Sequence, residues 1–164
     1  MPGGAHLKAH PRRLVPALGL SLLLLGAAAC SPGPVGIAVP TPAPEVASAC
    51  ASLINALPER ITEGERRETD PVSPLTRAYG DPPIELTCGV APPAGMAEAA
   101  SQCFEVNGVG WYAQEAENGV IFTTIGRKLY LEMAVPNAYS PEANVLTDVA
   151  PAIKSQNPVI TPCT

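Results

Sequence analysis

The chain has 164 residues, 46% of them hydrophobic, and its 10 basic and 15 acidic residues give a formal net charge of −5. Removal of residues 1–29, which are predicted to be a secretion signal, also removes both histidines and leaves 7 basic against 15 acidic residues, a net charge of −8. This composition excludes Ser-His-Asp and Cys-His catalysis and histidine-ligated metal sites, and it disfavours nucleic acid and anionic lipid as partners.

Residues 14–30, LVPALGLSLLLLGAAAC, predict a secretion signal that ends at Cys30. Arg12 and Arg13 precede a stretch of apolar or small residues and an alanine-rich cleavage site, the usual order of such a signal. As a helix, this stretch would be about 24 Å long, which is shorter than the ~30 Å hydrocarbon core of a bilayer. The pattern therefore favours a cleaved signal over a permanent membrane span.

Cys30 has two interpretations. Residues 25–30 resemble a bacterial lipobox, in which the cysteine receives a diacylglyceryl group and becomes the mature N-terminus, whereas Ala27-Ala28-Ala29 also suits an ordinary signal peptidase. Acylation of Cys30 leaves four cysteines, an even number that can pair as two disulfides. We predict a lipoprotein anchored to the outer face of the cytoplasmic membrane.

Residues 31–45, with five prolines, predict an extended tether of up to ~45 Å behind the anchor, and a proline-rich ligand for a partner is the alternative. A single domain is expected over residues 46–164. Its first element is a helix over residues 46–57 that carries Cys50 on its apolar face and ends at Pro58.

Residues 59–70 are mostly charged and predict a solvated loop or frayed helical extension, with a docking patch for a basic partner as the alternative. The prolines of residues 71–83 predict irregular structure. Alternation then predicts strands over residues 84–90, 109–116, 120–125 and 128–135, with a hairpin at Asn118-Gly119 and a short helix over residues 96–102. The middle of the chain is thus expected to be an antiparallel meander of about four strands.

Ser140-Pro141-Glu142 predicts the start of a last helix, whose buried stripe is Val145, Val149, Ala152 and Ile153. The expected fold is α+β, with the N-terminal and C-terminal helices packed on one face of the meander. Four cysteines allow three connectivities. We predict a local Cys88–Cys103 disulfide, and a Cys50–Cys163 disulfide that joins the first helix to the C-terminus.

Few residues are candidates for a binding or catalytic role. Trp111, Tyr112 and Tyr130 are candidates for a binding groove, although alternation places Trp111 on the core face. Arg127, in a turn, is either a grip for a carboxylate or phosphate or part of a surface ion pair. Glu115, Glu117 and Asp81 are candidates for a pair of catalytic carboxylates. No cofactor and no metal site are expected, and the cysteines lack the C-x-x-C spacing of a redox motif.

Several short motifs together resemble the actinobacterial lipoprotein family called domain of unknown function 3515: Ala78-Tyr79-Gly80-Asp81-Pro82-Pro83-Ile84, Cys88-Gly89-Val90, Cys103, Val106-Asn107-Gly108-Val109-Gly110-Trp111-Tyr112, Phe122-Thr123-Thr124, Gly126-Arg127, Tyr139 and residues 141–146. The resemblance covers residues 50–163 and implies an envelope lipoprotein without supplying a reaction. We therefore expect a non-catalytic module that binds an envelope protein or wall component. The alternative is a cell-wall hydrolase or transferase that works through carboxylates.

Overall fold

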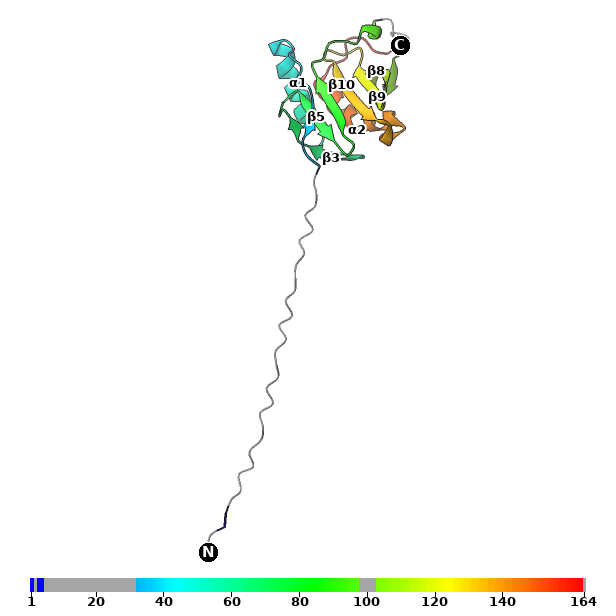
Figure 1. Cartoon of the computed structure of the whole chain (residues 1–164). Coiled ribbons are helices and arrows are strands. Elements are labelled where there is room, and N and C mark those ends of the chain that lie inside the picture. Colours follow the sequence, from blue (N-terminus) through cyan, green and yellow to red (C-terminus); the bar gives the residue numbers. More distant parts are fainter. Residues whose placement is uncertain (2, 5–31, 98–102, 164) are drawn as a thin grey trace. The chain divides into compact units, whose positions relative to one another are not determined.

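The computed structural model describes residues 1, 3–4, 32–97 and 103–163. The folded unit begins at Pro32 and is an α+β domain (Figure 1). Its helices are α1 (Pro44–Ala56) and α2 (Leu146–Gln156), with short 3-10 turns η1 (Ala94–Met96), η3 (Asn137–Tyr139) and η4 (Glu142–Val145). In the described part of the chain, no helix combines the length and the apolar character needed to cross a membrane.

The main sheet has eight antiparallel strands in the order β2-β3-β5-β6-β10-β9-β8-β7. Their bounds are β2 (Arg60–Ile61), β3 (Gly64–Arg67), β5 (Thr76–Tyr79), β6 (Ile84–Cys88), β7 (Phe104–Val106), β8 (Val109–Ala116), β9 (Gly119–Thr124) and β10 (Leu131–Pro136). A second, parallel pair joins β1 (Val35–Gly36) to β4 (Thr69–Asp70).

The four strands predicted from alternation are present as β6, β8, β9 and β10. In β6, Ile84, Leu86 and Cys88 are buried while the residues between them are partly exposed, as a half-buried strand requires. The predicted hairpin joins β8 to β9, and Ala116 pairs with Gly119 across it. Strands β6 and β10 bury alternate residues, whereas β8 and β9 also bury consecutive residues, so the alternation was a clear signal only for the first two.

The expectation of about four strands is too low. The charged residues 59–70 form β2, β3 and β4 instead of a loop or helical extension, and the proline-rich residues 71–83 contain β5. Strands β2 and β3 lie at the edge of the sheet, where backbone pairing does not require a hydrophobic side-chain pattern. The short β7 closes the other edge and was also missed.

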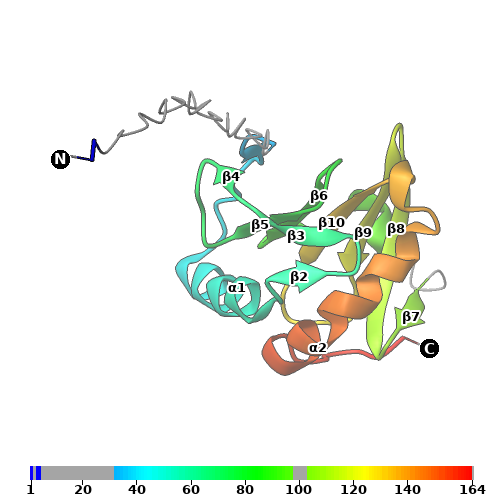
Figure 2. The ribbon, with the colours of Figure 1, turned by 90° about the horizontal axis from the view of Figure 1, so that it is seen from below.

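Both helices pack on the same face of the sheet, as predicted (Figure 2). Helix α1 contacts β6, α2 contacts β7 and β8, and the two helices contact each other. The predicted stripe of the last helix is buried: Val145, Val149, Ala152 and Ile153. Ser140 does not cap this helix, because the 3-10 turn η4 precedes α2.

The predicted tether is wrong from Gly33 onward, because this segment packs on the domain. Val35 and Ile37 are each 6% exposed and lie against Ala78 on β5. The amide of Val35 donates to the carbonyl of Glu68 at 2.8 Å, and that of Ile37 donates to Asp70 at 3.1 Å. Val35 and Ile37 alternate with exposed Gly36 and Ala38, a period of two that the surrounding prolines obscured in the sequence.

The predicted disulfide connectivity is also wrong. Cys50 pairs with Cys88 at a Cα–Cα distance of 5.5 Å, and Cys103 pairs with Cys163 at 5.7 Å. Helix α1 lies directly over β6, so the buried cysteines of these two elements face each other in the core. The C-terminal segment returns along β7 and β8, and Gly110 leaves room there for the second disulfide. The first helix is thus bonded to the sheet and not to the C-terminus.

Candidate functional site

A pocket of about 490 Å³ lies beside α1 and is lined by residues of β3, β4, β5 and the loop between β4 and β5. We call it the arginine pocket because three arginines, Arg66, Arg67 and Arg77, line it. The other lining residues are Glu59, Glu65, Glu68, Thr69, Val72, Ser73 and Thr76. The domain has only seven basic residues, so this pocket gathers three of them, and the three lining glutamates make it formally neutral.

Arg77 is the most enclosed charged side chain of the pocket. It stands on the core face of β5, opposite Leu86, and its side chain is 3% exposed. Its Nη2 donates to the carbonyl of Ile54 near the C-terminal end of α1, at 2.6 Å. Among the described residues its Nε and Nη1 have no hydrogen-bond partner. Burying two arginine donor groups without hydrogen-bond partners costs free energy. An acceptor that bonds to them would recover part of that cost.

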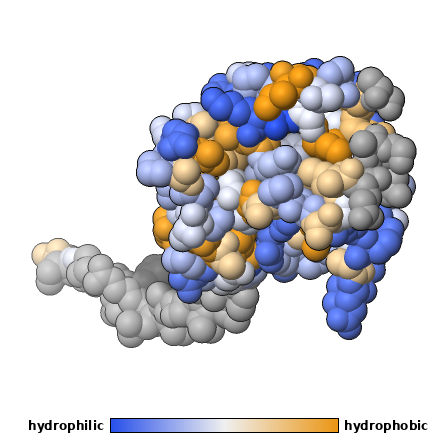
Figure 3. All heavy atoms as spheres, turned by 90° about the horizontal axis from the view of Figure 1, so that it is seen from above, coloured by the Kyte–Doolittle hydropathy of each residue, from blue (hydrophilic) through white to orange (hydrophobic). Residues whose placement is uncertain are grey.

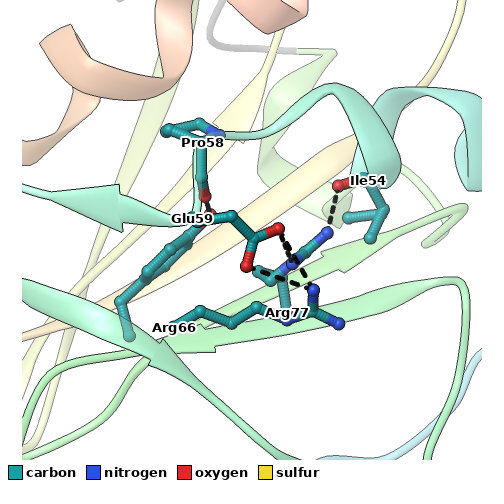
Figure 4. Close-up of polar contacts among 6 residues, drawn as sticks. Ile54, Pro58, Glu59, Arg66 and Arg77 are labelled. Carbon is teal, nitrogen blue, oxygen red and sulfur yellow. Dashed lines mark hydrogen bonds and ion pairs between the residues drawn. The ribbon is translucent and has the colours of Figure 1, made fainter.

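Glu59 supplies the nearest negative charge to Arg77. Its Oε1 lies 3.6 Å from Arg77 Nη1, which is too long for a hydrogen bond, and Arg66 Nη1 donates to Oε1 and Oε2 at 3.2 and 3.3 Å. Figure 4 shows the contacts of the Glu59 carboxylate with the guanidinium groups of Arg66 and Arg77. One carboxylate is therefore shared by two cations. Because the Glu59 side chain is 72% exposed, solvent and solutes reach it.

The electrostatics of the pocket follow from its burial. Desolvation lowers the pKa of Arg77, and the neighbouring Arg66 lowers it further, while Tyr79 and Glu59 oppose that shift. Desolvation also raises the pKa of Tyr79 to about 12, so its hydroxyl stays neutral and donates to the carbonyl of Pro58 at 2.5 Å. Arginine remains cationic at neutral pH, so Arg66 and Arg77 place two adjacent positive charges in the pocket, and the Glu59 carboxylate partly neutralises them.

Arg67 has a different role from the other two arginines. Its Nη1 donates to the carbonyl of Gly80 at 3.0 Å and its Nη2 donates to Gly33 at 2.6 Å, and Asp81 lies 3.6 Å away. The side chain therefore fastens the N-terminal segment to the turn after β5. The binding chemistry of the pocket rests on Arg66 and Arg77, whose planar donors suit a carboxylate or phosphate.

The three aromatic candidates do not line one groove, although Tyr130 lines a pocket of about 510 Å³ with Met96 and Ile125. Trp111 is fully buried in the core, where it makes an edge contact with Phe122 at 6.4 Å between ring centroids, as its position in the alternation predicted. Tyr112 lies on the other face of β8 and packs with Met96 and Tyr130. Figure 3 shows a face on which hydrophobic residues lie in small separate groups among hydrophilic ones, so no large apolar patch is visible there.

Arg127 neither grips an exposed anion nor joins a surface ion pair. It is 5% exposed, and its guanidinium donates to the carbonyls of Asn157 and Gly108 at 2.5 and 2.6 Å. Desolvation lowers its pKa, and Glu105 opposes that shift. Arg127 is thus a buried clamp between the C-terminal segment and the turn before β8.

The acidic candidates do not assemble into one site. Glu117 and Glu115 lie at the end of the β8–β9 hairpin and are exposed, while Asp81 lies beside Arg67. Glu117 shares a separate pocket of about 320 Å³ with Glu85. In the described ranges no group of three or more His, Cys, Asp or Glu residues is placed to hold a metal ion, and the predicted lack of a metal site stays a prediction.

Cys30 lies outside the described residues, so its acylation also stays a prediction.

The residues that sequence reasoning missed are Glu59, Arg66 and Arg77, which fell in segments predicted as a solvated loop and as irregular structure. One signal could have found them, because four of the seven basic residues downstream of Cys30 lie between Arg60 and Arg77.

Comparison with known proteins identifies a family but no function. No curated protein and no solved structure matches the chain. The model of the family described as "Protein of unknown function (DUF3515)" matches residues 14–160, which is most of the chain and includes both the arginine pocket and the hydrophobic stretch before Cys30. The chain therefore belongs to the DUF3515 family.

Proposed function

We propose that this protein is a lipoprotein of the outer face of the cytoplasmic membrane, and that its domain is a non-catalytic module that binds an envelope protein or wall component through a carboxylate group in the arginine pocket. The observation that carries the binding role is Arg77, a nearly buried guanidinium with two unpaired donor groups at a pocket open to solvent. The hydrophobic stretch that ends at Cys30 supports the anchor.

Glu59 indicates the class of ligand. Its carboxylate already occupies the space between Arg66 and Arg77, but it reaches Arg77 only at 3.6 Å. Exposed ion pairs contribute about 0–1 kcal/mol, because solvent screens them and ordering the side chains costs entropy. A ligand carboxylate that meets Arg77 in a bidentate arrangement would therefore displace Glu59 at little cost. Two of the three lining glutamates are paired, Glu59 with Arg66 and Glu65 with Arg60. The lining residues offer no histidine, and arginine is a poor acid or base, so the site favours binding over catalysis.

The binding proposal is tested with butyrate, which resembles a glutamate side chain, and with butyramide, its neutral analogue. The readout is the NMR shift of the arginine side chains in the full chain. Butyrate is expected to shift the Arg66 and Arg77 signals, and butyramide is not. Glu59→Gln removes the competing charge and should tighten butyrate binding, whereas Arg66→Gln should weaken it at least tenfold, about 1.4 kcal/mol.

Arg60→Gln is the matched control for Arg66→Gln, because Arg60 also lies at this edge and pairs with Glu65 but does not line the pocket. Equal effects of the two substitutions, or equal shifts with butyramide, would contradict the proposal.

In the native membrane, crosslinking of the anchored chain should capture a partner that is lost in Arg66→Gln and retained in Arg60→Gln. Intact-mass analysis of the same membranes should show residues 1–29 missing and a diacylglyceryl group on Cys30.

One observation favours the alternative, a carboxylate-dependent hydrolase or transferase. Glu85 on β6 and Glu132 on β10 lie on the sheet face opposite the helices, and desolvation raises the pKa of each. Raised carboxyl pKa values are typical of general acids. Release of soluble fragments from isolated cell wall by the purified chain, abolished in Glu85→Gln, would support this second function.

A further inference from the structure

The domain begins almost at the cysteine that is predicted to carry the lipid. The carbonyl of Gly33 accepts a hydrogen bond from Arg67 Nη2 at 2.6 Å, and the next residues pair with β4. Only Ser31 and Pro32 stand between Cys30 and Gly33. If Cys30 is acylated, as the proposed function holds, the connection between membrane and domain is very short.

The reach of this connection follows from backbone dimensions. Three Cα–Cα steps of at most ~3.6 Å allow about 11 Å between Cys30 and Gly33. A domain of this length has a radius of gyration of about 14 Å, so it is more than about 30 Å across. The connection is therefore shorter than the domain is wide. The domain can tilt on such a connection, but it cannot turn over.

Gly33 lies at one end of the sheet. Arg67 bonds both Gly33 and Gly80, which places the start of the domain beside the turn between β5 and β6. The hydroxyl of Tyr139 donates to the carbonyl of Pro82, so η3 lies at the same turn. The β8–β9 hairpin lies at the same end of the sheet, because the amide of Asn137 in η3 donates to the carbonyl of Asn118 at 2.9 Å. We call residues 80–83, 117–119 and 137–139 the near end.

The C-terminal segment lies at the opposite end. Strand β6 runs from Ile84 at the near end to Cys88, and Gly89 then bonds Tyr130. The turn that precedes this tyrosine holds the chain end, because Ile160 and Thr161 both donate to the carbonyl of Gly126. Within the folded domain, Figure 1 shows the C-terminus at the end away from the label of β3. We call residues 125–128 and 159–163 the far end.

We infer that the near end of the domain faces the lipid headgroups and that the far end is held away from the membrane, toward the cell wall. The short connection between Cys30 and Gly33 sets this orientation, and electrostatic attraction to the lipid headgroups does not. Glu117 and Asp81 at the near end are exposed acids, which an anionic leaflet repels within a Debye length of about 8 Å. The far end exposes Val159 and Ile160, by 53% and 69%.

The orientation is tested by tryptophan fluorescence of the acylated full chain in phosphatidylcholine vesicles that carry a nitroxide on the lipid headgroup. Trp111, the only tryptophan of the chain, is fully buried and gives the same background in every variant. Ala138→Trp places a reporter at an exposed position of the near end, and Val159→Trp places one at the far end. The nitroxide should quench the first reporter and leave the second unchanged.

An insertion of about ten Gly and Ser residues between Ser31 and Pro32 provides the second measurement. It adds a flexible reach of about 17 Å, so quenching of Ala138→Trp should fall although the chain still floats with the vesicles. Equal quenching of both reporters, or no quenching of Ala138→Trp in a chain that floats, would overturn the orientation and leave the anchor intact. A chain that does not float would overturn the anchor itself, and the orientation with it.

Discussion

Removal of the Cys50–Cys88 disulfide should destabilise the domain more than removal of Cys103–Cys163, although it closes the shorter loop. The sequence separations are 38 and 60 residues. In the chain-entropy model these loops correspond to about 3.9 and about 4.3 kcal/mol, so loop length alone favours the second disulfide by only about 0.4 kcal/mol.

Burial in the core makes the Cys50–Cys88 disulfide contribute more to stability than Cys103–Cys163. Cys50 and Cys88 are both 0% exposed in the core, whereas Cys103 and Cys163 are partly exposed. Replacing two fully buried cysteines by alanine removes apolar contacts that contribute about 1 kcal/mol each. The Cys50→Ala/Cys88→Ala variant should thus lose about 6 kcal/mol, and the Cys103→Ala/Cys163→Ala variant about 4 to 5 kcal/mol. Since domains are stable by about 5–15 kcal/mol, the first variant is expected to lose a large part of its stability.

Urea unfolding of the two double variants, followed by fluorescence of the buried Trp111, measures both losses. Non-reducing peptide mapping checks that the remaining disulfide is formed in each variant, and in the unaltered chain it should yield a Cys50–Cys88 peptide. A Cys103→Ala/Cys163→Ala variant that unfolds at the lower urea concentration would refute the reasoning, because loop length would then outweigh burial in the core.

Three further predictions concern single residues. Gly126→Ala should cost at least about 2 kcal/mol in urea unfolding, because Gly126 has φ +71° and an added methyl group would overlap the carbonyl of Thr161. Tyr79→Phe should cost about 1–2 kcal/mol by leaving the carbonyl of Pro58 unpaired, and it should remove a tyrosinate absorbance step at pH about 12. Glu132→Gln should raise the thermal midpoint at pH 7 but not below the ordinary carboxyl pKa. Burial raises the pKa of folded Glu132, so its ionisation lowers stability as pH rises from the unfolded toward the folded pKa.

Sequence alone determined those parts of the fold in which a side-chain pattern meets a single buried face. Strand β10 buries Leu131, Met133 and Val135, as alternation requires. The stripe of Val145, Val149 and Ile153 is buried for the same reason. Strand β8 has the predicted bounds, but it buries neighbouring residues on both faces, Trp111 and Tyr112. The family was also recognisable from short motifs along the chain. The predicted start of the last helix at Ser140 is wrong, because the 3-10 turns η3 and η4, which contact β9 and β10, precede α2.

Tertiary structure decided what depends on neighbours distant in sequence. Strands β2, β3 and β5 form because a backbone partner is present, although their charged and proline-rich sequences predict loops. The pairing of Cys50 with Cys88 depends on where α1 crosses the sheet, which no spacing of cysteines encodes. Arg77 shows the same limit at the candidate site. Its position on a strand was not predicted, and its burial beneath Glu59 arises only when the end of α1 covers β5.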